Sequence, residues 1–195
     1  MTEPTGPATR HRVNQGPRAA ARNRAALVAA AREVYAELGL DAPMAEIARR
    51  AGVGQGSLYR HFPDRDAVVA TVLEENVLQV EQAAAADGAT LADVLAVLTW
   101  HLVESAAFIG LLRAEYATVR REELGRAGEL GERVERALRG ELRDRGPLPA
   151  GSLMLAVAMV SGAVTGPTRE DRERRALEAW ALLGVEVGPV RPFPG

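Results

Sequence analysis

The sequence predicts an all-α protein of about nine helices. Apolar residues recur every three or four positions along most of the 195-residue chain, and no segment shows the sustained alternation of a β-strand. Long stretches are rich in Ala, Leu, Arg and Glu, which favour helix, whereas aromatic residues make up only 4% of the chain. The core must therefore be built mainly from Ala, Leu and Val on helices.

Proline, glycine and capping residues set the expected helix boundaries. Pro17 suits a first helical turn and Gly39 the position after a last turn. Asp64 and Thr90 are placed to cap the helices that follow them. The expected helices cover residues 17–38, 44–51, 54–62, 65–86, 91–105, 107–121, 129–145, 151–165 and 168–183.

Residues 122–145 combine helix-breaking with helix-forming signals. Glycines at 125, 128 and 131 each cost about 1 kcal/mol in a helix interior, so a break is expected there. Beyond it, Glu and Arg recur four residues apart, as in Glu129–Arg133, and such pairs stabilise a helix. After the last helix, residues 184–195 are expected to fray.

Charge is unevenly distributed along the chain. Residues 1–65 contain ten Arg and six Asp or Glu, whereas residues 66–195 contain fourteen Arg and twenty Asp or Glu. The basic part suggests contact with an anionic partner, although a chance partition of surface charge is the alternative. There is no cysteine, no signal peptide, and no apolar run near the roughly 20 residues that a membrane span needs. We therefore expect a soluble, cytoplasmic protein.

Residues 45–62 carry the most informative motif, two short helices joined by a sharp turn. Gly52 supplies the left-handed backbone that such a turn needs, and the small Ala48 lets the two helices cross closely. This spacing is typical of a helix-turn-helix that holds its second helix outward, toward the major groove of DNA. The residues expected to pin both helices against the first long helix are Ile47, Val53, Leu58 and Phe62.

The outward residues of the second helix suit DNA. Gln55 can pair with adenine, and Arg60 with guanine or a phosphate. Small residues let the backbone approach the duplex, and side-chain donors can bond phosphates. For each residue the alternative is an ordinary surface or packing role. The small residues are Gly54, Gly56 and Ser57, and the donors are Tyr59 and His61.

The motif also resembles that of the TetR family of transcriptional regulators. The stretch AEIARRAGVGQGSLYRHFPDRDAVV is similar to the family pattern at nearly every fixed position, and the resemblance covers residues 20–75. It implies base or adjacent backbone contacts for one set of residues and phosphate contacts for another. The first set is Gln55, Ser57 and Arg60. The second set is Tyr59, His61 and Arg65.

The chain departs from the family pattern near the start of the motif. Pro43 and Met44 stand where the family usually has Thr, and Ala45 stands where it sometimes has a basic residue. Arg65 replaces the usual Lys and keeps its charge. Base reading is therefore expected to depend more on the second short helix.

For the C-terminal part, the resemblance implies small-molecule binding and dimerisation. Residues 151–165 are apolar nearly all round and residues 168–183 have one apolar face, so these helices are expected to pair with those of a second copy. The alternative is that they are core helices of a monomer. A ligand cavity is expected here too, although plain packing explains the same residues. Its candidate lining is Trp100, His101, Glu104, Phe108, Tyr116 and Met154.

Together these observations predict a disordered tail (1–16), a helix-turn-helix DNA-binding domain (17–64) and a helical ligand-binding and dimerisation domain (65–190). The expected function is a transcriptional regulator that binds double-stranded operator DNA as a homodimer, most simply a repressor released by a small-molecule effector. No catalytic residue, cofactor or metal site is predicted, because the chain has no nucleophile–base pair or phosphate loop. The alternative is a helical ligand-binding or adaptor protein without operator binding.

Overall fold

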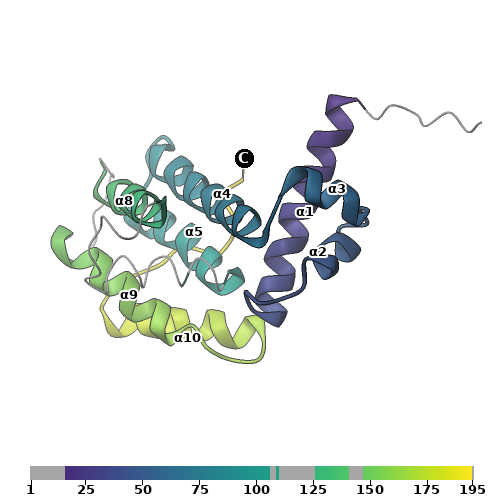
Figure 1. Cartoon of the computed structure of the whole chain (residues 1–195). Coiled ribbons are helices and arrows are strands. Elements are labelled where there is room, and N and C mark those ends of the chain that lie inside the picture. Colours follow the sequence, from purple (N-terminus) through teal and green to yellow (C-terminus); the bar gives the residue numbers. More distant parts are fainter. Residues whose placement is uncertain (1–15, 106–108, 110–125, 141–146, 195) are drawn as a thin grey trace, which may run out of the picture.

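The computed structural model describes residues 16–105, 109, 126–140 and 147–194 (Figure 1). These residues form eight α-helices, one short 3₁₀ helix and no strand, which confirms the all-α class. Apart from residue 109, the expected helix over 107–121 lies outside the described residues, as do residues 1–15 of the expected tail. The elements are α1 (Pro17–Leu38), α2 (Met44–Arg50), α3 (Gln55–His61), α4 (Arg65–Ala85), α5 (Leu91–Glu104), α8 (Arg126–Arg139), η1 (Ala150–Ser152), α9 (Leu153–Ala163) and α10 (Arg169–Leu182).

Side-chain caps start α4 and α5 where the sequence predicts them. The Asp64 carboxylate accepts a hydrogen bond from the backbone N–H of Ala67 at 2.8 Å. The Thr90 hydroxyl accepts one from the backbone N–H of Asp93 at 3.2 Å, and the Asp93 carboxylate accepts one from the backbone N–H of Thr90 at 3.1 Å. Each cap satisfies backbone donors that a helix start leaves unpaired, which is worth about 1 kcal/mol.

The buried apolar residues form two clusters that meet along α4. The first runs from Leu27 to Val72 and joins α1, α2, α3 and the start of α4. The second runs from Leu73 to Val185 and joins the rest of α4 to α5, α8, α9 and α10. Val69 packs against both. A displacement of α4 therefore acts on both clusters.

The second cluster is arranged around α4 and α5. α8 packs along α4, and α10 packs against both α5 and α9. In Figure 1, α9 and α10 form the lower edge of the molecule, away from α2 and α3. Among the described helices, none combines the length and apolar character needed to cross a bilayer.

The predicted start of this helix at residue 129 is three residues late, and the part of the expected break before residue 126 lies outside the described residues. α8 begins at Arg126 and includes Gly128 and Gly131. Leu130, Val134 and Leu138 are buried in the second cluster, so packing of one helical face offsets the low helix propensity of glycine. The expected extension to residue 145 falls partly on residues 141–146, which are outside the described residues.

The predicted fraying of the C-terminal segment is also wrong for the described residues 184–194. Gly184, at φ +70°, reverses the chain after α10, and the backbone N–H of Val185 donates to the carbonyl of Trp180 at 3.0 Å. The segment then returns to α5, where the N–H of Gly188 donates to the carbonyl of Ala92 at 3.1 Å. Val185 is buried in the second cluster. Apolar contact and one long-range hydrogen bond thus hold a segment that has no local helix signal.

Candidate nucleic-acid interface

The turn between α2 and α3 has the geometry that the sequence predicts. Gly52 lies at φ +64°, and its N–H donates to the carbonyl of Arg49 at 3.2 Å. The next N–H, of Val53, reaches back to the carbonyl of Ala48 at 3.0 Å. This pair of bonds is the Schellman ending of a helix, which favours glycine at the left-handed residue. It fixes the angle at which the chain leaves α2 and enters α3.

α3 has one buried face and one exposed face. Leu58 and the adjoining Phe62 are buried in the first cluster and fix the helix to α1. On the other face, Gln55, Gly56 and Arg60 are exposed, and Tyr59 is 53% exposed although it is a large aromatic side chain. The structure therefore brings most of the predicted DNA-contacting residues together on one outward surface.

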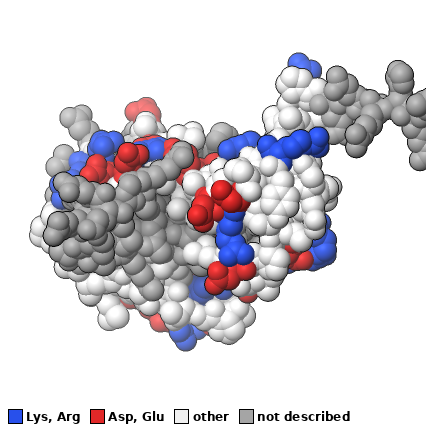
Figure 2. Space-filling view, viewed as in Figure 1, with Lys and Arg blue, Asp and Glu red and all other residues white. Residues whose placement is uncertain are grey.

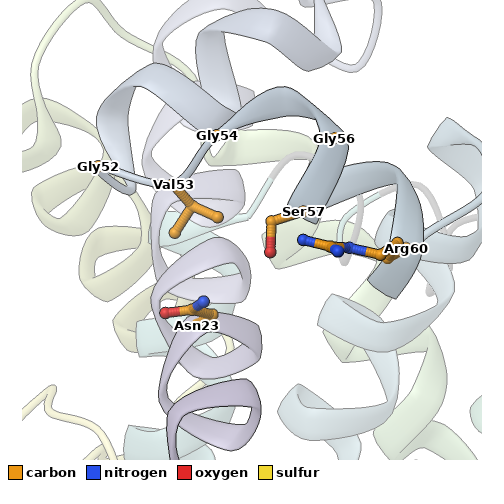
Figure 3. Close-up of a pocket in the computed structure, with 7 residues that line it drawn as sticks. All are labelled: Asn23, Gly52, Val53, Gly54, Gly56, Ser57 and Arg60. Atoms are coloured by element: carbon orange, nitrogen blue, oxygen red, sulfur yellow. The ribbon is translucent and has the colours of Figure 1, made fainter. Parts of the chain in front are cut away.

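An open hollow of about 600 Å³ lies where this surface meets α1 (Figure 3). Arg60 and Ser57 border it from α3, and Asn23 borders it from α1. A Cβ atom built on Gly54 or Gly56 would meet no atom within 4 Å. The hollow is thus open to an approaching ligand, and its lining residues carry no carboxylate.

His61 lies on a different side of α3. Its ring packs obliquely against Phe62, with centroids 6.3 Å apart, and it lines a second hollow between α1 and α4. Glu74 and Glu75 line the same hollow, together with Arg24. His61 is therefore at the edge of the exposed α3 surface and next to acidic residues.

The Arg65 guanidinium binds the loop that precedes α2. It donates to the Asp41 carboxylate at 3.2 Å, to the Asp41 carbonyl at 3.1 Å and to the Ala42 carbonyl at 3.2 Å. The resemblance to the TetR family implies a phosphate contact for Arg65. In the structure its side chain also holds the loop before α2 through these hydrogen bonds. These bonds join the start of α4 to the start of the helix-turn-helix.

Two arginines of α2 are also paired. Arg49 bonds both carboxylate oxygens of Glu46, and Arg50 bonds both oxygens of Glu37 on α1. The hydrogen bond from Arg49 holds the pKa of Glu46 below its usual value, and that from Arg50 does the same for Glu37. In Figure 2, blue side chains lie at the N-terminal end of α1 and along the upper edge of the region formed by α1, α2 and α3. Elsewhere in this view, blue and red side chains are mixed.

The candidate ligand-pocket residues are only partly brought together. Trp100 and His101 touch edge to face, with ring centroids 4.9 Å apart, and His101 is buried. Burial, with a contribution from Arg32, lowers the pKa of His101 to about 3. Glu104 instead forms an ion pair with Arg169 of α10, and Met154 packs at the margin of the second cluster. Phe108 and Tyr116 lie outside the described residues.

Sequence reasoning missed Asn23 and Asn76. Asn23 is an ordinary polar residue in the sequence, and its place beside α3 follows only from how α1 packs. Asn76 of α4 is 0% exposed, and neither polar atom of its amide has a hydrogen-bond partner among the described residues. It sits four residues from Val72 and from Val80, which are both buried, so the apolar spacing of α4 was a usable signal for a core position.

Comparison with known proteins agrees with this geometry. The family model described as bacterial regulatory proteins, tetR family, matches residues 27–72, the same span as the first buried cluster. A search of curated proteins found no match. Among solved structures, a TetR transcriptional regulator from Streptomyces coelicolor is 26% identical, with a TM-score of 0.56, and the match covers 88% of this chain and 99% of that one.

A second solved structure is closer in sequence. The TetR transcription regulatory protein from Mycobacterium vanbaalenii is 30% identical, and the match covers 86% of this chain and 97% of that one, with a TM-score of 0.47. The identity extends over nearly the whole of that protein, beyond the residues that the family model matches. With its helix-turn-helix and its all-α architecture, the chain belongs to the TetR family of bacterial regulatory proteins.

Proposed function

We propose that this protein is a dimeric, cytoplasmic repressor that binds operator DNA through α3 and is released by a small-molecule effector. The observation that carries the DNA-binding part is the turn at Gly52, which holds α3 with its polar face outward while Leu58 fixes the other face in the core. This is the arrangement that a recognition helix needs in order to enter a major groove.

The exposed face of α3 supplies the contacts. We assign base reading to Gln55, whose amide matches an adenine edge, and a contact with a backbone phosphate to Arg60. Tyr59 donates its hydroxyl to a phosphate, and the small Gly56 and Ser57 let the backbone approach closely. These roles agree with the exposure of each side chain.

His61 and Arg65 belong to the margin of this interface in our proposal. His61 is partly exposed at the end of α3, and we assign it a phosphate contact outside the acidic α1–α4 hollow that it also borders. Arg65 first positions the loop before α2 through its three hydrogen bonds, and its remaining exposed surface faces the flanking phosphate. The proposed DNA-binding unit covers residues 17–64, and the rest of the described chain to residue 190 forms the regulatory unit.

The outer faces of α9 and α10 support dimerisation. Leu155 and Met159 lie one turn apart on α9, and Met159 is 55% exposed. On α10, Leu177 is exposed and Leu182 is 89% exposed. An isologous dimer buries the same apolar patch on both copies. It also sets two recognition helices about 34–36 Å apart, which matches successive major grooves.

Effector release is proposed to act through α4. This helix belongs to both buried clusters, so a ligand that favours one position of α4 also favours one separation of the two α3 helices. Trp100, His101 and Met154 are the described residues that we place nearest the ligand. His101 is held neutral by its environment, which suits an uncharged effector.

Selection of binding sites from random 30-bp duplexes, followed by fluorescence anisotropy, tests the function. The wild type should enrich a palindromic site, and its affinity should fall steeply between 50 and 200 mM salt because phosphate contacts release counterions. Light scattering should give a dimer, and Met159→Asp should weaken it. Failure of the wild type to bind any duplex, selected or random, would favour the adaptor alternative.

A further inference from the structure

Ion pairs and hydrogen bonds engage most of the arginines near the first cluster, and they leave a few without a partner among the described residues. Of the eight arginines in residues 16–65, five bind oxygens of the protein itself. The three others have no hydrogen bond or ion pair to the described part of the chain, and all three are exposed. The five paired arginines are Arg24, Arg32, Arg49, Arg50 and Arg65. The other three are Arg18, Arg22 and Arg60.

Two of these three arginines are on α1, not on the recognition helix. Arg18 and Arg22 are one turn apart near the start of α1, and Arg22 directly precedes Asn23 in the chain. Asn23 borders the open hollow beside α3 that Arg60 and Ser57 border from the other side (Figure 3). Unpaired positive charge is therefore present both on α3, at the hollow, and on the first turns of α1, the helix that borders the hollow through Asn23.

The chemistry of this hollow selects an anion. Asn23 offers an amide N–H, Ser57 a hydroxyl and Arg60 a guanidinium, and no lining residue is acidic. The neighbouring hollow between α1 and α4 contrasts with it, because Glu74 and Glu75 line that one and would repel an anion. A phosphodiester oxygen of the DNA backbone matches the donors of the first hollow.

We propose that the N-terminal half of α1 is part of the DNA interface, with Asn23, Ser57 and Arg60 holding one backbone phosphate and Arg18 and Arg22 contacting its neighbours. This inference rests on the DNA-binding function proposed above. Contacts to the backbone carry no sequence information. Loss of the Asn23 contact must therefore weaken binding to every duplex by the same factor.

The test compares Asn23→Ala, Arg22→Ala and Arg18→Ala with the wild type on two 30-bp duplexes, one selected by the wild type and one scrambled. Gln82→Ala removes an exposed amide from the far end of α4, and Arg191→Ala removes an exposed arginine from the C-terminal segment, so these are the matched controls. Anisotropy is measured from 50 to 200 mM salt, and thermal melting confirms that each variant is folded.

We expect Asn23→Ala to weaken binding to both duplexes by about ten- to a hundredfold, a typical loss for one hydrogen bond to a charged group. Arg18→Ala and Arg22→Ala should each reduce the slope of log K against log salt by about one. The controls should match the wild type. If Asn23→Ala matches Gln82→Ala, or weakens only the selected duplex, the assignment of α1 is wrong. A wild type that binds neither duplex instead overturns the proposed function itself.

Discussion

The Arg133 guanidinium of α8 donates two parallel hydrogen bonds to the Glu81 carboxylate of α4, from Nε at 2.7 Å and from Nη2 at 2.6 Å. The remaining nitrogen of the same guanidinium bonds Glu74, two turns earlier on α4. One arginine thus spans the part of α4 that belongs to the second cluster. This clamp fixes α8 to the helix that both clusters share.

Removal of the clamp should destabilise the fold. We expect Arg133→Met to lower the free energy of unfolding by about 1–2 kcal/mol, because two partly buried carboxylates lose their partner. The hydrogen bond from Arg133 holds the pKa of Glu81 below its usual 4.5, so its contribution is full above that pH and is lost as the pH falls through the lower folded value. Urea unfolding at pH 7 and pH 3 measures this. Arg139→Met, which breaks only a pair within α8, is the control.

The left-handed residue at the turn gives a second prediction. Gly52→Ala should cost about 1–2 kcal/mol of stability through backbone strain alone, because a Cβ there meets no atom within 4 Å. Gly52→Asn should cost less, since asparagine tolerates this conformation. Chemical unfolding measures both variants. Equal stability of Gly52→Ala and the wild type would contradict the role given to this turn.

Substitutions of Arg65 can distinguish its hydrogen bonds to the loop before α2 from its positive charge. Arg65→Lys keeps the charge but cannot make the forked contacts to Asp41 and Ala42, so we expect a stability loss of about 0.5–1.5 kcal/mol. Arg65→Ala should lose a similar amount. Thermal melting of both variants, with Arg18→Lys as the control, measures the difference. A Lys variant as stable as the wild type would show that the loop contacts contribute little.

The buried His101 predicts a pH dependence of stability. Its pKa is about 3 in the folded protein and near 6.5 in the unfolded chain, so only the unfolded chain takes up this proton between those values. Stability should therefore fall as the pH is lowered from 6.5, by up to about 1.4 kcal/mol per unit from this residue. Urea unfolding from pH 8 to pH 4.5 should show a smaller slope for His101→Leu. Identical slopes would mean that the ring is protonated in the folded state.

We expect the buried amide of Asn76 to lower the free energy of unfolding relative to an apolar side chain of similar size. It is fully buried on α4, and within the described part of the chain neither polar atom is hydrogen-bonded, so Asn76→Leu should raise the free energy of unfolding by about 1 kcal/mol. Asn76→Ala removes the same amide but leaves a cavity, and should not give this gain. Thermal melting distinguishes the two. A less stable leucine variant would indicate that the amide has a partner in solution.

Much of the first cluster could be predicted because its signals are local. Proline, capping residues and the glycines at 39 and 52 act within a few residues of themselves, so the ends of α1–α5 lie within one or two residues of the predicted boundaries. The outward face of α3 followed from the spacing of Leu58 and Phe62, since burial of one helical face exposes the other.

Where contacts between distant segments compete with local signals, the sequence by itself did not determine the local structure or the ion pairs. Glu129 stands four residues before Arg133 and predicts a pair within α8, yet Arg133 reaches Glu74 and Glu81 because the packing of α8 brings two carboxylates within its range. Packing likewise retained Gly128 and Gly131 inside α8 and returned the C-terminal segment to α5. The sequence determined the helices and the motif, whereas the tertiary structure decided which arginines find a carboxylate partner among the described residues, since ion pairing depends on distances between helices far apart in the chain.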